Sequence, residues 1–91
     1  MIKKLWDMTP EEQTEEICMK AVKTTGYTIQ YIHNPSEAVQ LEAVKENGFV
    51  IQYIYNPSEE VCIKALLQNK ALYRYIKKEY RTDVVKLFME I

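Results

Sequence analysis

Hydrophobic and polar positions along this chain recur at a fixed short period, so that one pattern occurs three times. The segments 12–33, 34–55 and 56–77 align without a gap, and each neighbouring pair shares nine identical positions. Self-similarity at a fixed short period is typical of proteins built from stacked supersecondary units. The pattern therefore predicts three units, preceded by an N-terminal capping segment at 1–11 and followed by a C-terminal capping helix at 78–91.

The first half of each unit has the spacing of a helix that is apolar on more than one side, as expected for a helix packed between neighbours. Asn-Pro-Ser-Glu predicts the start of this helix at Asn34 and Asn56, with Asn as the N-cap, Pro at the first helical position and Glu at the third. In the first unit these features occur earlier, so we expect a longer helix that begins near Pro10. The matched apolar columns are Ile17/Val39/Val61, Met19/Leu41/Ile63, Ala21/Ala43/Ala65 and Val22/Val44/Leu66.

The second half of each unit predicts a short helix that needs packing to be stable. Gly26 and Gly48 stand where the first helix ends, a position that often requires a left-handed backbone. The third unit has Asn69-Lys70 there, so we expect a different turn. The predicted short helices cover 27–33, 49–55 and 71–77, and their constant core column is Ile32, Ile54 and Ile76.

Both ends of the array carry hydrophobic residues that could cover the edges of the core. Leu5, Trp6 and Met8 precede the first unit. Thr82-Asp83 predicts the start of a last helix, which bears Val84, Val85, Leu87, Phe88 and Ile91. The predicted fold is one all-α domain, a short right-handed αα-solenoid of about three and a half 22-residue units with terminal capping segments.

Three motifs carry a resemblance to a known class of repeats: N-P-S-E-x-V at the helix start, A-V-K-x-N-G at the turn, and I-Q-Y-I in the second helix. Together they resemble short αα tandem repeats of the HEAT-like and leucine-rich-variant kind, which occur as uncharacterised arrays in bacterial and phage proteins. The resemblance covers 12–77 and implies a protein-recognition surface. It further implies, by analogy, a small phage or mobile-element product that inhibits a host protein, such as a defence protein, by covering its surface.

The composition is that of a folded chain, with 47% apolar and 27% charged residues. Charge is unevenly distributed although the total is only −1. Residues 1–60 hold five basic and ten acidic side chains, and residues 61–91 hold seven basic and three acidic ones. The basic C-terminal third could face nucleic acid or an acidic partner, could complement the acidic part of a second copy, or could be solvated surface.

Residues that could support catalysis or bind metal are few. His33 is the only histidine and is expected at the surface. Cys18 and Cys62 lie two periods apart, which in a stacked array is beyond disulfide reach. The cluster Glu11, Glu12, Glu15 and Glu16 could bind cations or mimic phosphates, but such clusters are more often solvated. We expect no enzyme, cofactor or metal site.

Targeting signals are also missing from the sequence. No apolar run has the length of a membrane span, and the N-terminal residues lack the apolar core of a signal peptide. Together with a chain that looks complete, this predicts a cytoplasmic protein.

An unbroken column of tyrosines, Tyr31, Tyr53 and Tyr75, runs through the second helices. These rings could seal the joints between units or form a contact stripe, because Tyr and Arg are frequent in binding hot spots. Residues that depart from their columns are the stronger candidates for contact. The predicted partner-binding residues are Tyr53, Tyr55, Tyr73, Arg74, Lys77, Lys78 and Arg81.

Segment 70–81 interleaves basic and aromatic residues, a pattern that can bind single-stranded nucleic acid by stacking and phosphate contacts. Helical spacing would place Arg74, Lys77, Lys78 and Arg81 on one side of it. Nucleic-acid binding is therefore the alternative to protein binding. A homodimer through Leu87, Phe88 and Ile91 is a further possibility.

Overall fold

The computed structural model describes residues 3–91, and every regular element among them is helical. The four α-helices are α1 (Glu15–Thr24), α2 (Glu37–Glu46), α3 (Glu59–Gln68) and α4 (Asp83–Met89). The shorter elements are 3-10 helices: η1 (Leu5–Asp7), η2 (Gly26–Tyr31), η3 (Gly48–Tyr53), η4 (Lys70–Tyr75) and η5 (Lys78–Tyr80). The molecule is elongated, with extents of 50 × 21 × 17 Å.

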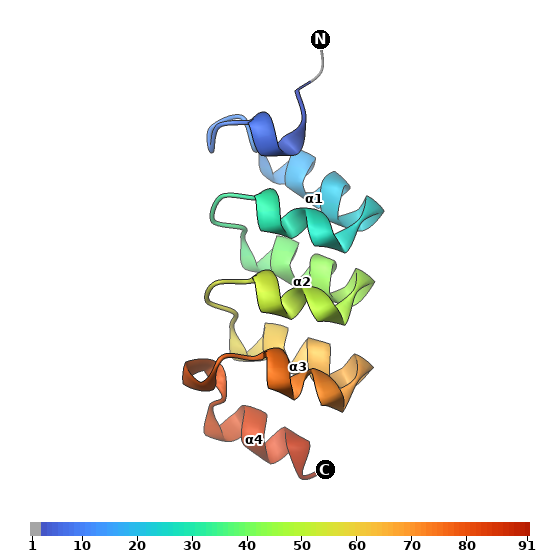
Figure 1. The fold of residues 1–91 in the computed structure, drawn as a ribbon, viewed down its shortest axis with the longest axis vertical. Helices are drawn as coiled ribbons and strands as arrows, with labels where there is room; N and C mark the ends of the chain where they lie inside the picture. Colours follow the sequence, from blue (N-terminus) through green and yellow to red (C-terminus); the bar gives the residue numbers. More distant parts are fainter. Residues whose placement is uncertain (1–2) are drawn as a thin grey trace.

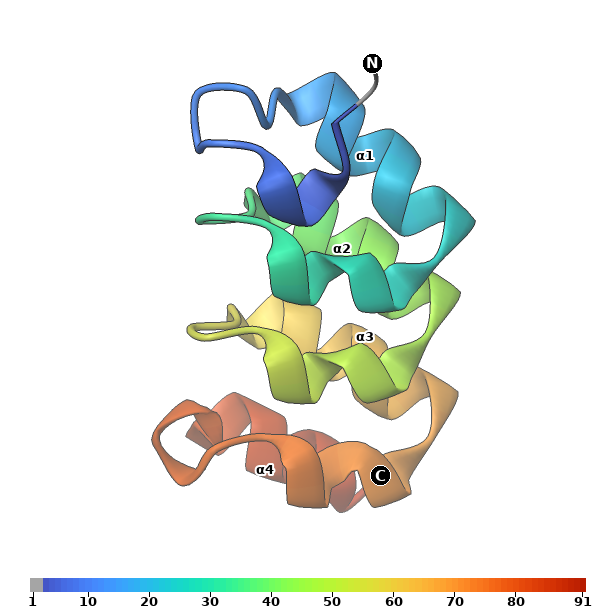
Figure 2. The same ribbon diagram turned by 45° about the horizontal axis from the view of Figure 1, so that its top comes forward.

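The helices form two layers, with η1 and α4 at opposite ends of the long axis (Figure 1). In the α layer, α1, α2, α3 and α4 pack successively on one another. Helices η1 to η4 form the second layer, which we call the η layer, seen from another side in Figure 2. Helix η2 packs on both α1 and α2, and η3 packs on both α2 and α3. Each of these two short helices is therefore stabilised by two longer ones.

The α-helices begin at hydroxyl caps, two residues later than the Asn-Pro motif predicts. The Oγ of Ser36 accepts a hydrogen bond from the Val39 amide at 3.2 Å, and Ser58 caps α3 in the same way. Asn34 lies outside the helix with φ at 49°, a left-handed conformation that Asn tolerates. Asn and Ser are comparable caps. The prediction that Asn34 is the N-cap was therefore wrong, and Ser36 takes this role.

The prediction of a longer first helix is also wrong, because α1 begins at Glu15 behind the cap residue Thr14. The earlier motif forms a separate turn. The Thr9 amide donates to the Glu12 carboxylate at 2.9 Å, and the Glu12 amide donates back to the Thr9 hydroxyl at 3.3 Å. The reciprocal bonds of a capping box are thus present without a helix that continues from them.

The two glycines do not adopt a left-handed conformation, contrary to the sequence prediction. They are required by the close approach of the next unit. A Cβ on Gly26 would lie 2.9 Å from the carbonyl oxygen of Ala43, and one on Gly48 would lie 2.7 Å from the Cδ1 of Leu72. In the third unit Lys70 occupies the same position, exposed, with its Nζ 5.9 Å from the centre of the Phe88 ring.

The turn of the third unit was expected to differ, but its geometry is the same. Asn69 has φ −162° and ψ 112°, against −157° and 106° for Asn47. Each side chain caps its 3-10 helix, accepting from the amide two residues ahead at 2.9–3.0 Å. The prediction of a core column at Ile32, Ile54 and Ile76 is confirmed, because all three are at most 8% exposed.

Two glutamines bond to backbone groups of a neighbouring part of the fold: Gln13 joins the N-terminal segment to the first unit, and Gln68 joins the third unit to the second. Gln13 donates to the carbonyl oxygens of Leu5 at 3.0 Å and Tyr31 at 2.8 Å, and accepts from the His33 amide at 2.8 Å. This bonding holds η1 against η2. Gln68 donates to carbonyl oxygens at the end of α2 and accepts from the Gly48 amide at 2.9 Å. It supplies partners for groups that a helix end leaves unpaired.

The two ends of the stack are covered differently. At the C-terminal end α4 begins behind the Thr82 cap, as predicted, and packs on α3 with Val85 fully buried. At the N-terminal end η1 packs on η2 and extends the η layer only (Figure 2). Among residues 3–91, no helix is long and apolar enough to cross a membrane.

Candidate functional site

Six aromatic side chains form a ladder across the joints of the η layer. Each rung joins rings from neighbouring elements, with centroid distances of 5.4 to 5.8 Å and tilted or edge-on geometry that aromatic pairs favour. Repetition builds two of the three rungs, because residues at two matched positions of the unit meet across successive joints, and Trp6 from the N-terminal segment adds the third. The rungs of the aromatic ladder are Trp6–Tyr31, Tyr27–Tyr53 and Phe49–Tyr75.

The ladder both seals the joints and faces solvent. The two roles considered for the tyrosine column, sealing the joints and forming an exposed stripe, are therefore compatible. Tyr31, Tyr53 and Phe49 are 42–43% exposed, and Trp6 is 57% exposed. The inward positions of the same helices are occupied by residues such as Ile29 and Ile51, each 2% exposed. One part of each ring contacts its partner, and the rest is available for contact.

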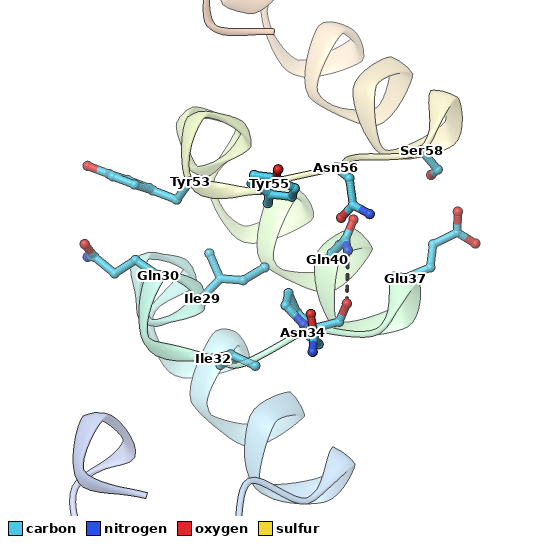
Figure 3. A pocket seen from close by; sticks show the side chains of 11 residues that line it. Ile29, Gln30, Ile32, Asn34, Glu37, Gln40, Tyr53, Tyr55, Asn56 and Ser58 are labelled. Carbon is cyan, nitrogen blue, oxygen red and sulfur yellow. Dashed lines mark hydrogen bonds between the residues drawn. The ribbon is translucent and has the colours of Figure 1, made fainter. Parts of the chain in front are cut away.

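A groove of about 540 Å³ opens beside the ladder, between the loops that precede α2 and α3. Its residues are shown in Figure 3. Gln30 and Tyr53 lie at one end and point away from the α layer, while Glu37 and Ser58 lie at the other end. Its apolar lining comes from Ile29, Ile32 and Pro35, and its polar lining from Asn34, Gln40, Tyr55 and Asn56. We call this the inter-loop groove.

Gln40 is the buried polar residue of this groove, and sequence reasoning missed it. It is 7% exposed, and its Nε2 donates to the Pro35 carbonyl oxygen at 3.0 Å (Figure 3). Its matched positions in the other units are Cys18 and Cys62. The signal that could have identified it was a Gln in a column of buried cysteines. The buried amide of Gln40 gives the inter-loop groove a hydrogen-bonding group where the matched positions of the other units have a thiol.

Two smaller hollows lie along the same layer. One of about 240 Å³ is lined by Trp6, Tyr31 and His33 among others, and one of about 210 Å³ by Phe49, Arg74 and Tyr75 among others. His33 is exposed, as expected, and borders the first hollow. The η layer therefore offers recesses between aromatic side chains at successive joints.

The predicted contact residues lie in η3, η4 and the segments that follow them, where they form two cation–aromatic pairs. The Lys77 Nζ lies 4.9 Å from the centre of the Tyr55 ring, which is 80% exposed. The Arg81 guanidinium carbon lies 4.5 Å from the centre of the Tyr73 ring. The first pair is an outward feature, and the second is partly buried.

Arg81 has a structural role. Its Nε donates to the Ile76 carbonyl oxygen at 2.8 Å and its Nη2 to that of Arg74 at 3.4 Å. Segment 70–81 is not one helix, because Ile76 and Lys77 are extended between η4 and η5. The predicted alignment of its four cations, Arg74, Lys77, Lys78 and Arg81, on one side of a helix is therefore wrong. Arg74, Lys77 and Lys78 remain exposed, whereas Arg81 folds back and fixes the chain between η4 and α4.

The acidic cluster at the start of the chain is largely engaged in local contacts. Lys3 pairs with Glu12 at 2.7 Å, and this bond, together with the Thr9 amide, lowers the pKa of that carboxyl. Glu15 accepts from the Ser36 hydroxyl at 2.7–2.9 Å, and Glu16 lies 3.9 Å from Lys20. Within residues 3–91, no group of three or more His, Cys, Asp or Glu side chains could hold a metal ion.

Cys18 and Cys62 are both free and buried. Burial is the main cause that raises the pKa of each thiol, to about 11 for Cys62, and a neighbouring glutamate adds to it. The thiols are therefore protonated at neutral pH and unreactive, since the thiolate is the nucleophile.

The residues of the predicted homodimer differ in exposure. Leu87 and Ile91 are 61% and 86% exposed, whereas Phe88 is half-buried and packs against the core. Leu87 and Ile91 thus lie on the outer side of the C-terminal end, and Phe88 contributes to the attachment of α4.

Comparisons with models of known protein families, with curated proteins and with solved structures gave no match.

Proposed function

We propose that this chain is a short αα-solenoid whose η layer recognises another protein. The observation that carries the proposal is the aromatic ladder, six rings paired across the joints, of which five are 38–57% exposed and Tyr75 is partly buried. Aromatic side chains supply large contact areas at a low cost in conformational entropy, and Tyr and Trp are enriched in interface hot spots. A ring already fixed by its partner loses little further freedom on binding.

The recesses support the same function. Protein interfaces concentrate their binding energy where a side chain of one partner enters a pocket of the other. The inter-loop groove and the two smaller hollows follow the ladder along the η layer. Residues Tyr53, Tyr55, Arg74, Lys77 and Lys78 are exposed beside them and are the proposed contacts. Tyr73 and Arg81 act by holding the segment that carries Lys77 and Lys78.

A module of this size that covers a working surface of a larger host protein, such as a defence protein, would inhibit it. That consequence rests on the identity of the partner, which a capture experiment can supply. The tagged chain is incubated with lysate of its source cells, with and without nuclease, and the bound proteins are identified by mass spectrometry. We expect a nuclease-resistant protein partner.

Two variants make the capture specific. Tyr31→Ala with Tyr53→Ala removes two rungs of the ladder and should abolish recovery of the partner. Leu67→Ala is the matched control, because Leu67 is also apolar and is 66% exposed but lies on α3. Circular dichroism checks that the variants are folded. Equal recovery by the ladder variant and the control would contradict recognition by the η layer.

Nucleic-acid binding is the second candidate, favoured by the exposed Lys77–Tyr55 pair. Stacking on aromatic rings beside cations is how proteins bind single strands. It predicts recovery that disappears with nuclease, and affinity that falls steeply with salt because phosphate contacts release counterions. Arg74→Glu with Lys78→Glu should weaken binding in either case, so nuclease and salt responses separate the two candidates.

A further inference from the structure

Acidic side chains are almost absent from helices η2 to η4 and the loops that follow them, although η1 contains Asp7. Segments 26–35 and 48–57 contain none, and segment 70–81 contains only Glu79. The other twelve carboxylates of the thirteen lie in the α-helices, next to them, or near the two ends of the chain. Segment 70–81 holds five of the twelve basic residues. The two layers therefore differ in charge, and the difference is largest in the third unit.

The exposed cations of this segment have no acidic partner within the described part of the chain. Among residues 3–91, the direct ion pairs are Lys3–Glu12 and Lys20–Glu16, both of which precede η2. Arg74 borders the hollow beside Tyr75, and Lys77 lies over the Tyr55 ring. Positive charge from the third unit thus adjoins the aromatic ladder at Tyr75 and the inter-loop groove at Tyr55.

The inter-loop groove adds hydrogen-bonding groups suited to a polypeptide backbone. Gln40 uses its Nε2 on the Pro35 carbonyl oxygen, which leaves its Oε1 as an acceptor in the groove. Asn34 and Asn56 supply further amides from the two loops (Figure 3). Amide side chains can both donate and accept, and so can match successive N–H and C=O groups of an extended chain.

We propose that the partner presents an extended acidic segment to the second and third units of the η layer. The proposal deepens, and rests on, the function proposed above. The peptide backbone lies in the inter-loop groove at Gln40, and its carboxylates lie against Arg74, Lys77 and Lys78. Glu37, at the end of the groove away from Gln30 and Tyr53, disfavours carboxylates of the segment at that end.

Charge distribution favours a peptide over a nucleic-acid strand. A strand that stacked along the whole ladder would place phosphates at every unit, and phosphate contacts provide most of the affinity of such complexes. Cations flank the ladder mainly in the third unit, while 26–35 and 48–57 contain no Lys or Arg. A peptide can concentrate its carboxylates where the cations are.

The test uses three labelled probes of equal length and the full chain. The first is a twelve-residue peptide of alternating Glu and Leu, the second has Gln in place of every Glu, and the third is a thymidine dodecanucleotide. Fluorescence anisotropy gives the affinities at low and moderate salt, and amide chemical shifts locate the bound probe. We expect the Glu peptide to bind more tightly than the Gln peptide, with shifts at Gln40, Tyr55 and Lys77.

Matched variants test the cations. Arg74→Gln and Lys77→Gln should each weaken the Glu peptide by about two- to five-fold, the range for exposed ion pairs. Lys23→Gln and Lys45→Gln, both exposed on the α layer, should leave its affinity unchanged. None of these four variants should alter the affinity for the Gln peptide.

Two other results would contradict the proposal. Equal binding of the Glu and Gln peptides, or no binding of the Glu peptide to the η layer, would overturn the acidic segment but not protein recognition, which the lysate capture tests separately. Tighter binding of the oligonucleotide than of the Glu peptide, on the same residues and with nuclease-sensitive capture, would overturn both proposals.

Discussion

The α layer and the η layer are built from the same units but differ in the kinds of side chain they expose. In the α layer Val39, Ala43 and Val61 are fully buried, and the outward positions are mostly charged. Tyr53 at the end of η3 and Tyr55 just after it are 42% and 80% exposed although each directly neighbours the buried Ile54. The outward η positions can therefore vary from unit to unit while the core columns preserve the fold.

The sharpest contrast should come from the neighbours Ile54 and Tyr55. Ile54→Ala removes a side chain that is 2% exposed and should destabilise the chain by about 3 kcal/mol, through lost burial and the cavity left behind. Tyr55→Ala should change stability by less than about 0.5 kcal/mol, as for other exposed positions. Urea unfolding monitored by circular dichroism measures both. Equal losses would contradict the division between the inward and outward faces.

The two glycines should differ although they occupy the same place in the unit. On Gly26 a Cβ meets a backbone carbonyl oxygen at 2.9 Å, whereas on Gly48 it meets the ends of the Leu72 and Gln68 side chains at 2.7 and 2.9 Å. Side-chain ends can move and helix backbone cannot, so Gly26→Ala should cost about 2 kcal/mol and Gly48→Ala clearly less. Thermal unfolding of the two variants compares them directly. A larger effect at Gly48 would mean that the units approach each other differently.

The helix caps provide a test of the corrected start of the α-helices. Ser58→Ala should destabilise the chain by about 1 kcal/mol, because the Val61 amide loses its acceptor. Ser36→Ala should cost somewhat more, because Ser36 also donates to Glu15. Asn34→Gly should be within about 0.5 kcal/mol of the wild type, since glycine readily adopts its φ of 49°. If Asn34 were the cap, Ser36→Ala would instead be nearly neutral in urea unfolding.

The smallest expected effect is a pH dependence from the α layer. The folded-state pKa of Cys62, raised to about 11 from an ordinary 9.0, makes a contribution to stability that is complete below pH 9 and is lost as pH rises toward 11. At pH 9.5 this loss should be roughly 0.8 kcal/mol. Urea unfolding of the wild type and Cys62→Ala at pH 7 and 9.5 isolates it. A loss of the same size in the variant would assign the pH dependence to other groups.

The sequence by itself determined that the elements are helical and where they recur. Apolar columns at helical spacing, repeated from unit to unit, identified residues of the core, including Val39, Val61 and Ile54, because burial of these columns is what makes short helices stable. The last helix was located at Thr82-Asp83 for a related reason, since a hydroxyl cap before an apolar run is a local signal.

Only the tertiary structure decided which of several locally adequate residues takes which role. Ser36 rather than Asn34 caps α2, and Gly26 is required by the carbonyl oxygen of Ala43 in the next unit rather than by its own backbone angle. The ladder pairs Tyr27 with Tyr53, and the groove places Gln40 between two loops. These relations depend on distances between units, which propensities and periodicity within one unit do not contain.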